Sequence, residues 1–320
     1  MSVPEELRSR YRKQKYRLVG AHSAVKTCHW VRRSLNTGGQ ENCYKNRFYG
    51  VPTHRCLQMT PSLCHCTQSC VFCWRATPET LGVSWDQTRD ISDPEDPDSV
   101  VEGCLAAHRK AIYGFGGNPN VEKGLLKEAL NPLHAAISLE GEPTLYPRLG
   151  ELVDSFRGHG FKSVFIVTNG TRPDVLSNLS TEPSQLYVSL CAPDEDTYRK
   201  TCRPMLGDGW RRLMETLELL ESFSCPTVLR HTLVPGLNMV NPGGYAKQAE
   251  LSNATYLEPK AAMSVGSARA RFGYDEMAWF DDVKRFAEEI AAECSYRIVD
   301  EHRLSSIVLL SRLDKPIRLY

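Results

Sequence analysis

The sequence lacks several features that mark whole classes of proteins. None of its 320 residues belongs to an uninterrupted apolar run approaching the roughly 20 residues that a membrane-spanning helix requires. The first residues are basic and contain no apolar core, so they predict no secretion signal. There is no internal repeat and no long low-complexity segment. We therefore expect a cytoplasmic protein with no membrane partner, built as one large domain or two modest ones.

Cysteine, by contrast, is abundant, with twelve residues. Thiols stay reduced in the cytoplasm, so these cysteines predict metal ligands, catalytic groups or core residues rather than disulfides. Seven of the twelve lie before residue 74 and require a chemical explanation. The other five stand singly, and we expect each to be buried. These five are Cys104, Cys191, Cys202, Cys225 and Cys294.

Positive charge is concentrated at the N-terminus. The whole chain carries a net charge of only +1, which alone predicts no polyanionic partner. Residues 1–56, however, hold twelve Lys or Arg against three Glu, a local balance of +9. Aromatic residues are interleaved with these cations, a pattern that suits either an RNA-binding surface or a solvated basic extension. They are Tyr11, Tyr16, Trp30, Tyr44, Phe48 and Tyr49.

Strand and helix patterns alternate along most of the chain. The expected strands are residues 55–60, 135–139, 164–168, 186–190, 227–233 and 254–259. The expected helices lie near residues 99–113, 147–160, 173–179, 208–222 and 243–251. The acidic, proline-broken segment 85–99 predicts a loop, and the tail predicts a helix near 275–292 and short strands at 296–299 and 306–310.

This alternation predicts an α/β fold of parallel βα units. Six units fall short of a closed eight-stranded barrel, so we expect a partial, TIM-like (β/α)6 barrel. We expect residues 1–54 to form a basic extension, residues 55–270 the barrel and residues 271–320 a completing helix and strands. In such folds active sites collect at the carboxyl ends of the strands, where the cysteine stretch, "LEGEP" and "TNG" all fall.

The stretch "CTQSCVFC" places Cys66, Cys70 and Cys73 in a C-x3-C-x2-C pattern. A structural zinc site normally needs four protein ligands, whereas three thiolates on a 4Fe–4S cluster leave one iron free. This spacing resembles that of the radical S-adenosylmethionine enzymes. The resemblance implies that the free iron binds S-adenosylmethionine, which is cleaved to a radical that abstracts hydrogen from the substrate. A zinc site remains the alternative.

Residues expected near the carboxyl ends of the barrel strands extend this resemblance. Phe72 matches the aromatic position that lies beside the adenine of S-adenosylmethionine. The turn Gly141, Glu142 and Pro143 resembles the superfamily's "GGEP", although Glu140 replaces the first glycine. Asn169 and Ser189 are expected to reach the ribose or the carboxylate of the cofactor.

Three further cysteines, Cys28, Cys43 and Cys56, are too widely spaced for one ligand loop. A folded N-terminal extension can still bring them together. They are either ligands of an auxiliary cluster, again with an open iron, or three unrelated buried thiols. Cys64 and His65 lie near the first cluster motif but are not expected to be ligands.

The chain as a whole resembles the tRNA 4-demethylwyosine synthase family. The motifs that carry this likeness are "CYKNRFYG", "HRCLQMTPSLCHCTQSCVFCWR", "SLEGEPTLYP", "FIVTNGTRP", "LYVSLCAPDEDTYRKTCRP" and "YLEPKAAMSVGS". The resemblance implies a radical carbon–carbon lyase that condenses pyruvate carbons with N1-methylguanosine, next to the anticodon of tRNA(Phe), to form a tricyclic base. The target base must leave the stack to meet the radical.

The resemblance also implies roles for individual residues. Cys66, Cys70 and Cys73 would hold the cluster that binds S-adenosylmethionine. The trio Cys28, Cys43 and Cys56 would hold a second 4Fe–4S cluster that binds pyruvate. Lys45 would form a Schiff base with the pyruvate ketone, unless it makes only a salt bridge to the carboxylate.

The remaining expectations concern partners and rival functions. Eukaryotic members carry a flavodoxin-like domain that this chain does not contain, which predicts the archaeal type, an external flavodoxin-like or ferredoxin-like electron donor, and a monomer. The rival interpretations are another radical enzyme, such as an activase or a peptide modifier, and a non-catalytic zinc-binding RNA protein.

Overall fold

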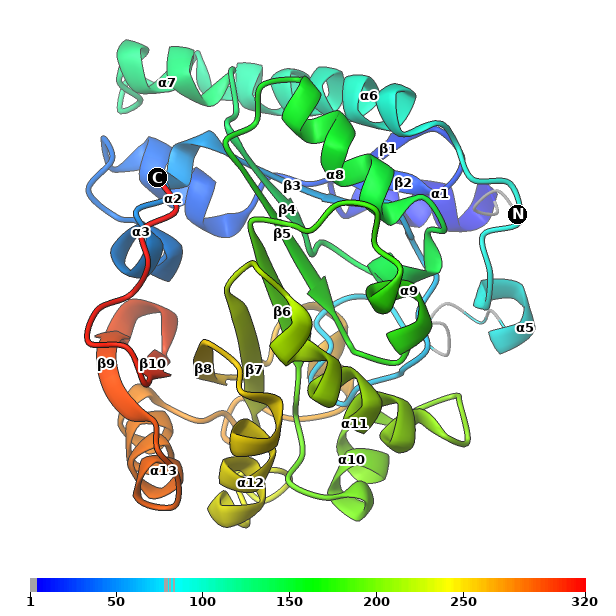
Figure 1. The fold of residues 1–320 in the computed structure, drawn as a ribbon. Helices are drawn as coiled ribbons and strands as arrows, with labels where there is room; N and C mark the ends of the chain where they lie inside the picture. The colour runs from blue at the N-terminus through cyan, green and yellow to red at the C-terminus, as the bar shows by residue number, and fades with distance from the viewer. Residues whose placement is uncertain (1–4, 78–79, 81, 83) are drawn as a thin grey trace.

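The computed structural model describes residues 5–77, 80, 82 and 84–320, so the first four residues of the expected extension lie outside it. Within this part of the chain, ten strands form one sheet in the order β1-β2-β3-β4-β5-β6-β7-β8-β10-β9 (Figure 1). The strands are β1 (Arg17–Val19), β2 (Ser23–Val25), β3 (Cys56–Thr60), β4 (His134–Ile137), β5 (Ser163–Thr168), β6 (Gln185–Ser189), β7 (Thr227–Leu233), β8 (Tyr256–Ala261), β9 (Arg297–His302) and β10 (Ile307–Ser311).

Helices precede and connect these strands. The described helices are α1 (Glu5–Lys13), α2 (His29–Asn36), α3 (Tyr44–Tyr49), α5 (Trp85–Thr88), α6 (Pro97–Ile112), α7 (Lys123–Ala129), α8 (Leu149–Gly158), α9 (Pro173–Ser177), α10 (Glu195–Cys202), α11 (Gly209–Leu219), α12 (Pro242–Ser252) and α13 (Phe280–Ala292). Among the residues described, no helix is long and apolar enough to cross a membrane.

Strands β3 to β8 are parallel, as the sequence predicts, and form the six βα units of a partial barrel. Antiparallel strands extend both edges, with β2 pairing with β3 and β10 pairing with β8. The sheet is not closed, because β1 and β9 stand at its two ends. Strand β5, "SVFIVT", is mostly buried, as expected of a parallel strand covered on both faces.

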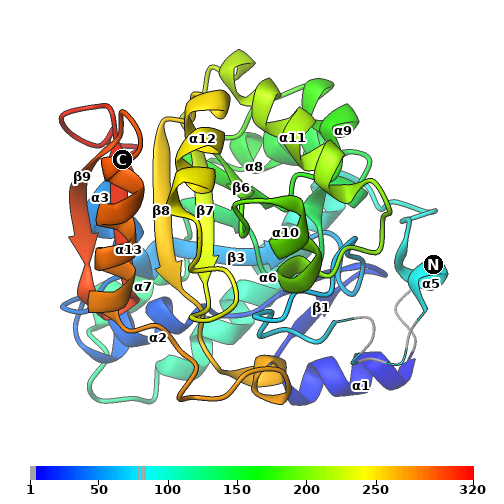
Figure 2. The same ribbon diagram turned by 90° about the horizontal axis from the view of Figure 1, so that it is seen from below.

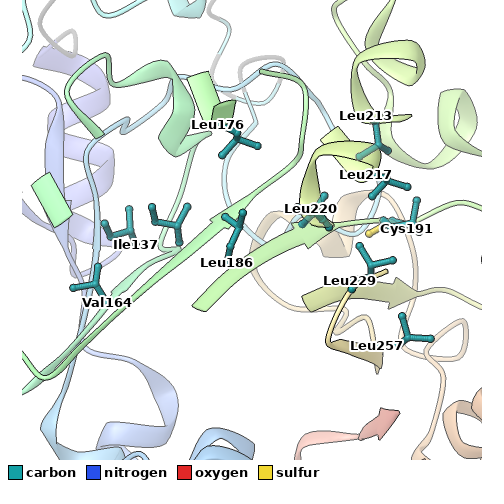
Figure 3. Packing of buried hydrophobic residues seen from close by; sticks show 14 of the residues in the cluster. Ile137, Val164, Leu176, Leu186, Cys191, Leu213, Leu217, Leu220, Leu229 and Leu257 are labelled. Atoms are coloured by element: carbon teal, nitrogen blue, oxygen red, sulfur yellow. The ribbon is translucent and has the colours of Figure 1, made fainter. Parts of the chain in front are cut away.

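Alternate strand residues face two different cores. The outer core packs side chains from the strands against α6, α8, α9, α11, α12 and α13, and these helices lie around the outside of the curved sheet (Figures 1 and 2). Figure 3 shows Ile137, Val164, Leu186 and Leu229 from the strands among leucines of α9 and α11. The inner core packs Phe48 and Tyr49 of α3 against the opposite face of the sheet.

The inner core is built from four parallel strands and one antiparallel strand. Its buried members are Phe48, Tyr49, Val51, Phe165, Tyr187, Val228, Tyr256, Ile307 and Leu309. The C-terminal tail reaches this region, because the backbone N–H of Leu319 donates to the carbonyl of Tyr49 at 2.9 Å. Helix α3 is therefore held inside the curve of the sheet.

One prediction about the chain is wrong, and the interpretation of the basic extension as an RNA-binding surface loses most of its aromatic rings. The segment 85–99 is not a continuous loop, because it contains α5 and the start of α6, where Asp96 caps the helix by accepting from the backbone N–H groups of Asp98 and Ser99. Four of the six aromatic rings in the basic extension cannot stack on RNA, because they are buried in the protein core. These are Tyr11, Tyr16, Phe48 and Tyr49.

A buried carboxylate anchors the N-terminal extension to the barrel. The hydroxyl of Tyr11 donates to Oε1 of Glu140, which lies in the turn after β4 and is 3% exposed. Burial raises the pKa of Tyr16, and the charge of Glu140 raises it further. The ammonium of Lys26 lies 4.4 Å from the ring centroid of Tyr16 and supplies a nearby positive charge. Glu140 stands where the superfamily pattern has a glycine, and its side chain binds the N-terminal extension through the hydrogen bond from Tyr11.

This tie predicts that Tyr11→Phe lowers the free energy of unfolding by about 1–3 kcal/mol, because a buried carboxylate oxygen loses its donor. Urea denaturation measures the change. Tyr113→Phe is the matched control, because Tyr113 is 72% exposed, and its midpoint should not move. Equal midpoints for the two variants would show that the Tyr11 hydrogen bond does not stabilise the fold.

Candidate functional site

The loop that carries the cysteine motif follows β3 and is fixed by backbone hydrogen bonds. The N–H of Ser69 donates to the carbonyl of Arg203 at 3.1 Å, and the N–H of Val71 donates to that of Thr201 at 2.9 Å. Arg271 closes the other side, donating from Nε to the Val71 carbonyl at 3.0 Å and from Nη2 to the Cys73 carbonyl. The loop is therefore held in place by segments far along the chain.

The three thiols of this loop share one environment. Cys66, Cys70 and Cys73 are free and partly exposed. Burial raises the pKa of the Cys66 thiol, and the neighbouring charges of Cys70, Glu142 and Cys73 raise it further. Burial likewise raises the pKa of Cys73, with Cys70 adding to the rise. Three thiolates that repel one another are stabilised when they share a cationic metal centre, so this donor set fits a bound cluster.

A second trio forms where three elements begin. Cys28 precedes α2, Cys43 precedes α3, and Cys56 is the first residue of β3. Burial raises the pKa of Cys28 and of Cys56, and in each the charge of Cys43 raises it further. The hydroxyl of Thr53 lies 3.7 Å from the Cys43 sulfur. Like the first, this trio is a set of partly exposed free thiols whose charges interact.

The described residues contain no group of three or more His, Cys, Asp or Glu side chains gathered around a single metal ion. In an iron–sulfur cluster each thiolate is bound to a different iron, so the ligands stand farther apart than those around one ion. One further cysteine lies beside the first trio, because hydrogen bonds with Cys191 and Cys70 raise the pKa of the Cys202 thiol. Cys104, Cys191 and Cys202 are buried as expected, whereas Cys225 and Cys294 are partly exposed.

Glu142 joins the loops at the mouth of the barrel. Its Oε1 accepts from the hydroxyl of Thr168 at 2.6 Å, and its Oε2 accepts from the backbone N–H of Asn169 at 2.7 Å. Its own backbone N–H donates to the carbonyl of His65 at 2.7 Å. Thr144 donates to the same carboxylate from its hydroxyl at 2.7 Å. Both carboxylate oxygens of Glu142 therefore accept hydrogen bonds from the protein itself. A ligand at this edge would contact the backbone of the turn rather than this carboxylate.

Asn169 is brought to the cysteine loop by this arrangement. Its Nδ2 donates to the hydroxyl of Thr67 at 2.7 Å and lies 4.0 Å from the Cys66 sulfur. Its Oδ1 accepts from the hydroxyl of Thr171 at 2.7 Å. The side chain is therefore fixed beside the first trio.

The other residues expected at the cofactor site lie around the same edge. Phe72 is partly buried and packs against both the outer core and a small cluster that contains Val234 and Phe272. Ser189 ends β6 and is partly exposed. Pro143 begins a short 3-10 helix after the turn.

Gly141 requires the absence of a side chain. Its φ is +71°, a left-handed conformation that other residues adopt at a cost. A Cβ at this position would stand 2.0 Å from the carbonyl oxygen of Ser62 and 2.5 Å from that of His65. The turn and the cysteine loop can approach each other only because this residue is glycine.

Lys45 reaches the inner face of the sheet from α3. Its Nζ lies 3.6 Å from the ring centroid of Phe165 and 4.5 Å from that of Tyr187. Burial lowers the pKa of Lys45 to about 8, while the charges of Cys56 and Glu258 act in the opposite direction. An amine in this position loses its proton more easily than an exposed lysine does.

Sequence reasoning missed two groups of charges, each built around a buried glutamate with partly buried cations beside it. Arg230 and Glu258 form an ion pair on the inner face, and Lys260 lies two residues beyond Glu258 on the same face of β8. Lys26 and Arg75 lie close enough to Glu140 to affect its pKa. Alternate residues of a strand share a face, so the charged residues within "VLRHTL" and "YLEPKA" could have indicated that Arg230, Glu258 and Lys260 lie on one face of the sheet.

The basic extension keeps an exposed charged surface. Arg10, Lys13, Lys15, Arg32 and Arg33 are all exposed. This surface is still compatible with the predicted contact to RNA phosphates.

Comparisons with known proteins agree with this geometry. A model of the radical SAM superfamily matches residues 61–244, and a model of wyosine base formation matches residues 251–312. The tRNA 4-demethylwyosine synthase of Pyrococcus abyssi is 46% identical over 98% of this chain and 90% of its own. That of Methanocaldococcus jannaschii is 39% identical over 98% of both chains.

Two solved structures are also similar. A structure of TYW1 with a lysine–pyruvate adduct bound superposes with a TM-score of 0.88 at 36% identity, covering 100% of this chain and 99% of the other. An archaeal TYW1 crystal structure gives a TM-score of 0.79 at 34% identity, covering 99% of both.

The geometry of the turn predicts that Gly141→Ala lowers the free energy of unfolding by about 2–4 kcal/mol, because it adds left-handed strain and a clash with backbone oxygens. Thermal and urea unfolding measure this change. Gly158→Ala is the control, since nothing lies within 4 Å of a Cβ built there, and it should be neutral or slightly stabilising. An unchanged stability of Gly141→Ala would mean that the close approach of the two loops is not required.

Proposed function

Because this chain belongs to the family of S-adenosyl-L-methionine-dependent tRNA 4-demethylwyosine synthases, we propose that its two cysteine trios and Lys45 act together on the inner face of the partial barrel. The chain is a radical SAM enzyme that modifies tRNA and forms the tricyclic wyosine base. Its cofactors include S-adenosylmethionine and a 4Fe–4S cluster. The family reaction joins pyruvate carbons to N1-methylguanosine of tRNA(Phe).

The observation that carries the proposal is the position of Lys45. It lies two residues from Cys43 and points over Phe165 and Tyr187, on the inner face of the strands. The carboxyl ends of those strands bear Asn169, which contacts the first cysteine loop. We propose that Lys45 acts between the second trio and the strand ends that carry the first.

Cys66, Cys70 and Cys73 are proposed to hold the cluster that binds S-adenosylmethionine. When bound, this cluster supplies the electron that begins radical cleavage of the cofactor. The loop's backbone hydrogen bonds hold the three thiols in a fixed arrangement. The proposed cofactor-binding residues are Phe72, Gly141, Glu142, Pro143, Asn169 and Ser189. Glu142 acts by fixing the turn and Asn169, since its carboxylate is used internally.

Cys28, Cys43 and Cys56 are proposed to hold a second 4Fe–4S cluster that faces pyruvate. Support comes from burial and the charge of Cys43, which raise the pKa of both Cys28 and Cys56, and from the nearby charge of Lys45, which acts in the opposite direction. Lys45 is proposed to attack the ketone carbon of pyruvate, forming an imine with loss of water. The related TYW1 structure with a lysine–pyruvate adduct makes this role preferable to a salt bridge.

The proposed partners follow from this reaction. The tRNA must present its target base out of the stack, and the exposed cations of residues 1–54 are proposed to contact its phosphates. An external flavodoxin-like or ferredoxin-like protein is proposed as the electron donor, and the enzyme as a monomer. We retain residues 55–270 as the proposed barrel unit and residues 271–320 as its completing segment.

Iron content tests the two clusters. Anaerobically reconstituted protein should contain about eight irons per chain, because each cubane holds four. The variants Cys28/Cys43/Cys56→Ala and Cys66/Cys70/Cys73→Ala should each contain about four. The control Cys225/Cys294→Ala should match the parent. A parent and a Cys28/Cys43/Cys56→Ala variant that both hold about four irons would reject the second cluster.

Reductive trapping tests Lys45. We expect borohydride to fix pyruvate covalently on the parent protein, with the adduct located at Lys45 by peptide mass spectrometry. Lys45→Arg keeps a positive charge but cannot form an imine, so its adduct should disappear. Lys162→Arg, at an exposed position, should leave the adduct unchanged. Pyruvate binding without any trapped adduct in the parent would instead assign Lys45 a salt bridge.

A further inference from the structure

We propose that Arg230 binds the carboxylate of the 2-oxo acid substrate, because its guanidinium and the Lys45 ammonium lie against the same tyrosine ring on the inner face of the barrel. This assignment rests on the proposed role of Lys45 and adds the group that selects the acid.

Lys45 and Arg230 both contact the ring of Tyr187. Nζ of Lys45 lies 4.5 Å from the centroid of the Tyr187 ring, and Cζ of Arg230 lies 5.1 Å from the same centroid. In a 2-oxo acid the ketone carbon is bonded directly to the carboxylate carbon. Because both cations contact one ring, we infer that a substrate whose ketone meets Lys45 directs its carboxylate toward Arg230.

Arg230 retains capacity to bind an anion. Its Nη2 donates to the hydroxyl of Tyr44 at 2.8 Å and to Oε2 of Glu258. Its Nε, by contrast, is buried and has no hydrogen-bond partner among the described residues. The side chain is still 15% exposed. A guanidinium has five N–H donors in a planar fork that matches a carboxylate, so further bonds are available.

Glu258 stabilises the partly buried charge of Arg230 and leaves other N–H groups of the guanidinium available to a substrate carboxylate. The carboxylate is fully buried, and its Oε1 accepts from the hydroxyl of Tyr49 at 2.5 Å. The hydroxyl of Tyr187 lies 3.4 Å from the same oxygen. Glu258 therefore compensates the Arg230 charge while its own charge is spread over several donors, which limits its repulsion of a substrate carboxylate.

Lys260, a partly buried cation of β8, is less suited to this role than Arg230 of β7. Its Nζ donates to the backbone carbonyl of Ser305 at 2.7 Å, so its ammonium is bound to the turn between β9 and β10. Burial lowers the pKa of Lys260 to about 8. Arg230 keeps its charge and makes the ring contact that links it to Lys45.

A carboxylate could reach Arg230 from two sources. Pyruvate is one, and S-adenosylmethionine is the other, because Ser189, an expected cofactor residue, is paired with Arg230 across β6 and β7. The shared chemistry is carboxylate recognition by a guanidinium. The ring shared with Lys45 favours pyruvate, and the experiment separates the two.

The test compares pyruvate with pyruvamide, a neutral analogue of the same size, by borohydride trapping on Lys45. We expect the parent to trap pyruvate preferentially. Arg230→Gln/Glu258→Gln removes both charges together and so avoids an unpaired buried carboxylate. Its preference for pyruvate over pyruvamide should fall at least about tenfold, because the charge-assisted bonds are lost. Glu258→Gln alone keeps the guanidinium and should keep the preference.

Two further measurements determine binding and folding of the same variants. Equilibrium dialysis measures binding of S-adenosylmethionine and of labelled pyruvate to the same proteins after melting curves confirm that they are folded. If the double variant does not fold, Arg230→Lys replaces it and should weaken pyruvate binding, since a lysine cannot bind a carboxylate through two parallel N–H groups.

An unchanged pyruvate preference in the folded double variant overturns the proposal. Loss of S-adenosylmethionine binding with that preference intact also overturns it and assigns Arg230 to the cofactor. If the parent traps neither carbonyl compound, the imine role of Lys45 fails. The dialysis of pyruvate then decides the role of Arg230 independently.

Discussion

The buried carboxylate of Glu142 is the interaction on which the arrangement of the site depends. It accepts hydrogen bonds from Thr144, Thr168 and Asn169, and its backbone bonds the cysteine loop at His65. Three loops from the ends of β3, β4 and β5 are thereby fixed relative to one another. Loss of any one donor would leave a buried charged oxygen less satisfied, which is costly. The rigidity of the cofactor edge therefore follows from one side chain that the ligand itself does not need to touch.

Below that edge, the inner face of the sheet buries charges that an ordinary core would exclude. Arg230, Glu258 and Lys45 lie among tyrosine and phenylalanine rings, and Arg230 is ion-paired with Glu258. Buried ion pairs contribute little to stability compared with apolar residues of the same volume. Their concentration beside one cysteine trio is consistent with a role in chemistry. Helix α3 is central here because it carries Lys45 on one turn and the core residues Phe48 and Tyr49 on the next.

The sequence predicts the parts of this structure that depend on local patterns. The six parallel strands are predicted because buried strands such as β5 are continuous runs of apolar residues, and the C-x3-C-x2-C motif lies within one loop. Contacts between distant segments are not predicted from such patterns. Tyr11 looks like a stacking residue in a basic segment until its acceptor, Glu140, is located 129 residues away. The pairing of Arg230 with Glu258 likewise depends on the register between β7 and β8.

The most direct test of the account is the carbon balance of the modified nucleoside. Anaerobic enzyme with both clusters would be supplied with S-adenosylmethionine, a reductant, tRNA containing N1-methylguanosine, and pyruvate labelled with carbon-13 at every position. We expect a tricyclic nucleoside that has gained two labelled carbons, because the carboxyl carbon of pyruvate is lost. Cleavage of S-adenosylmethionine with an unlabelled nucleoside, or with all three labelled carbons retained, would contradict it.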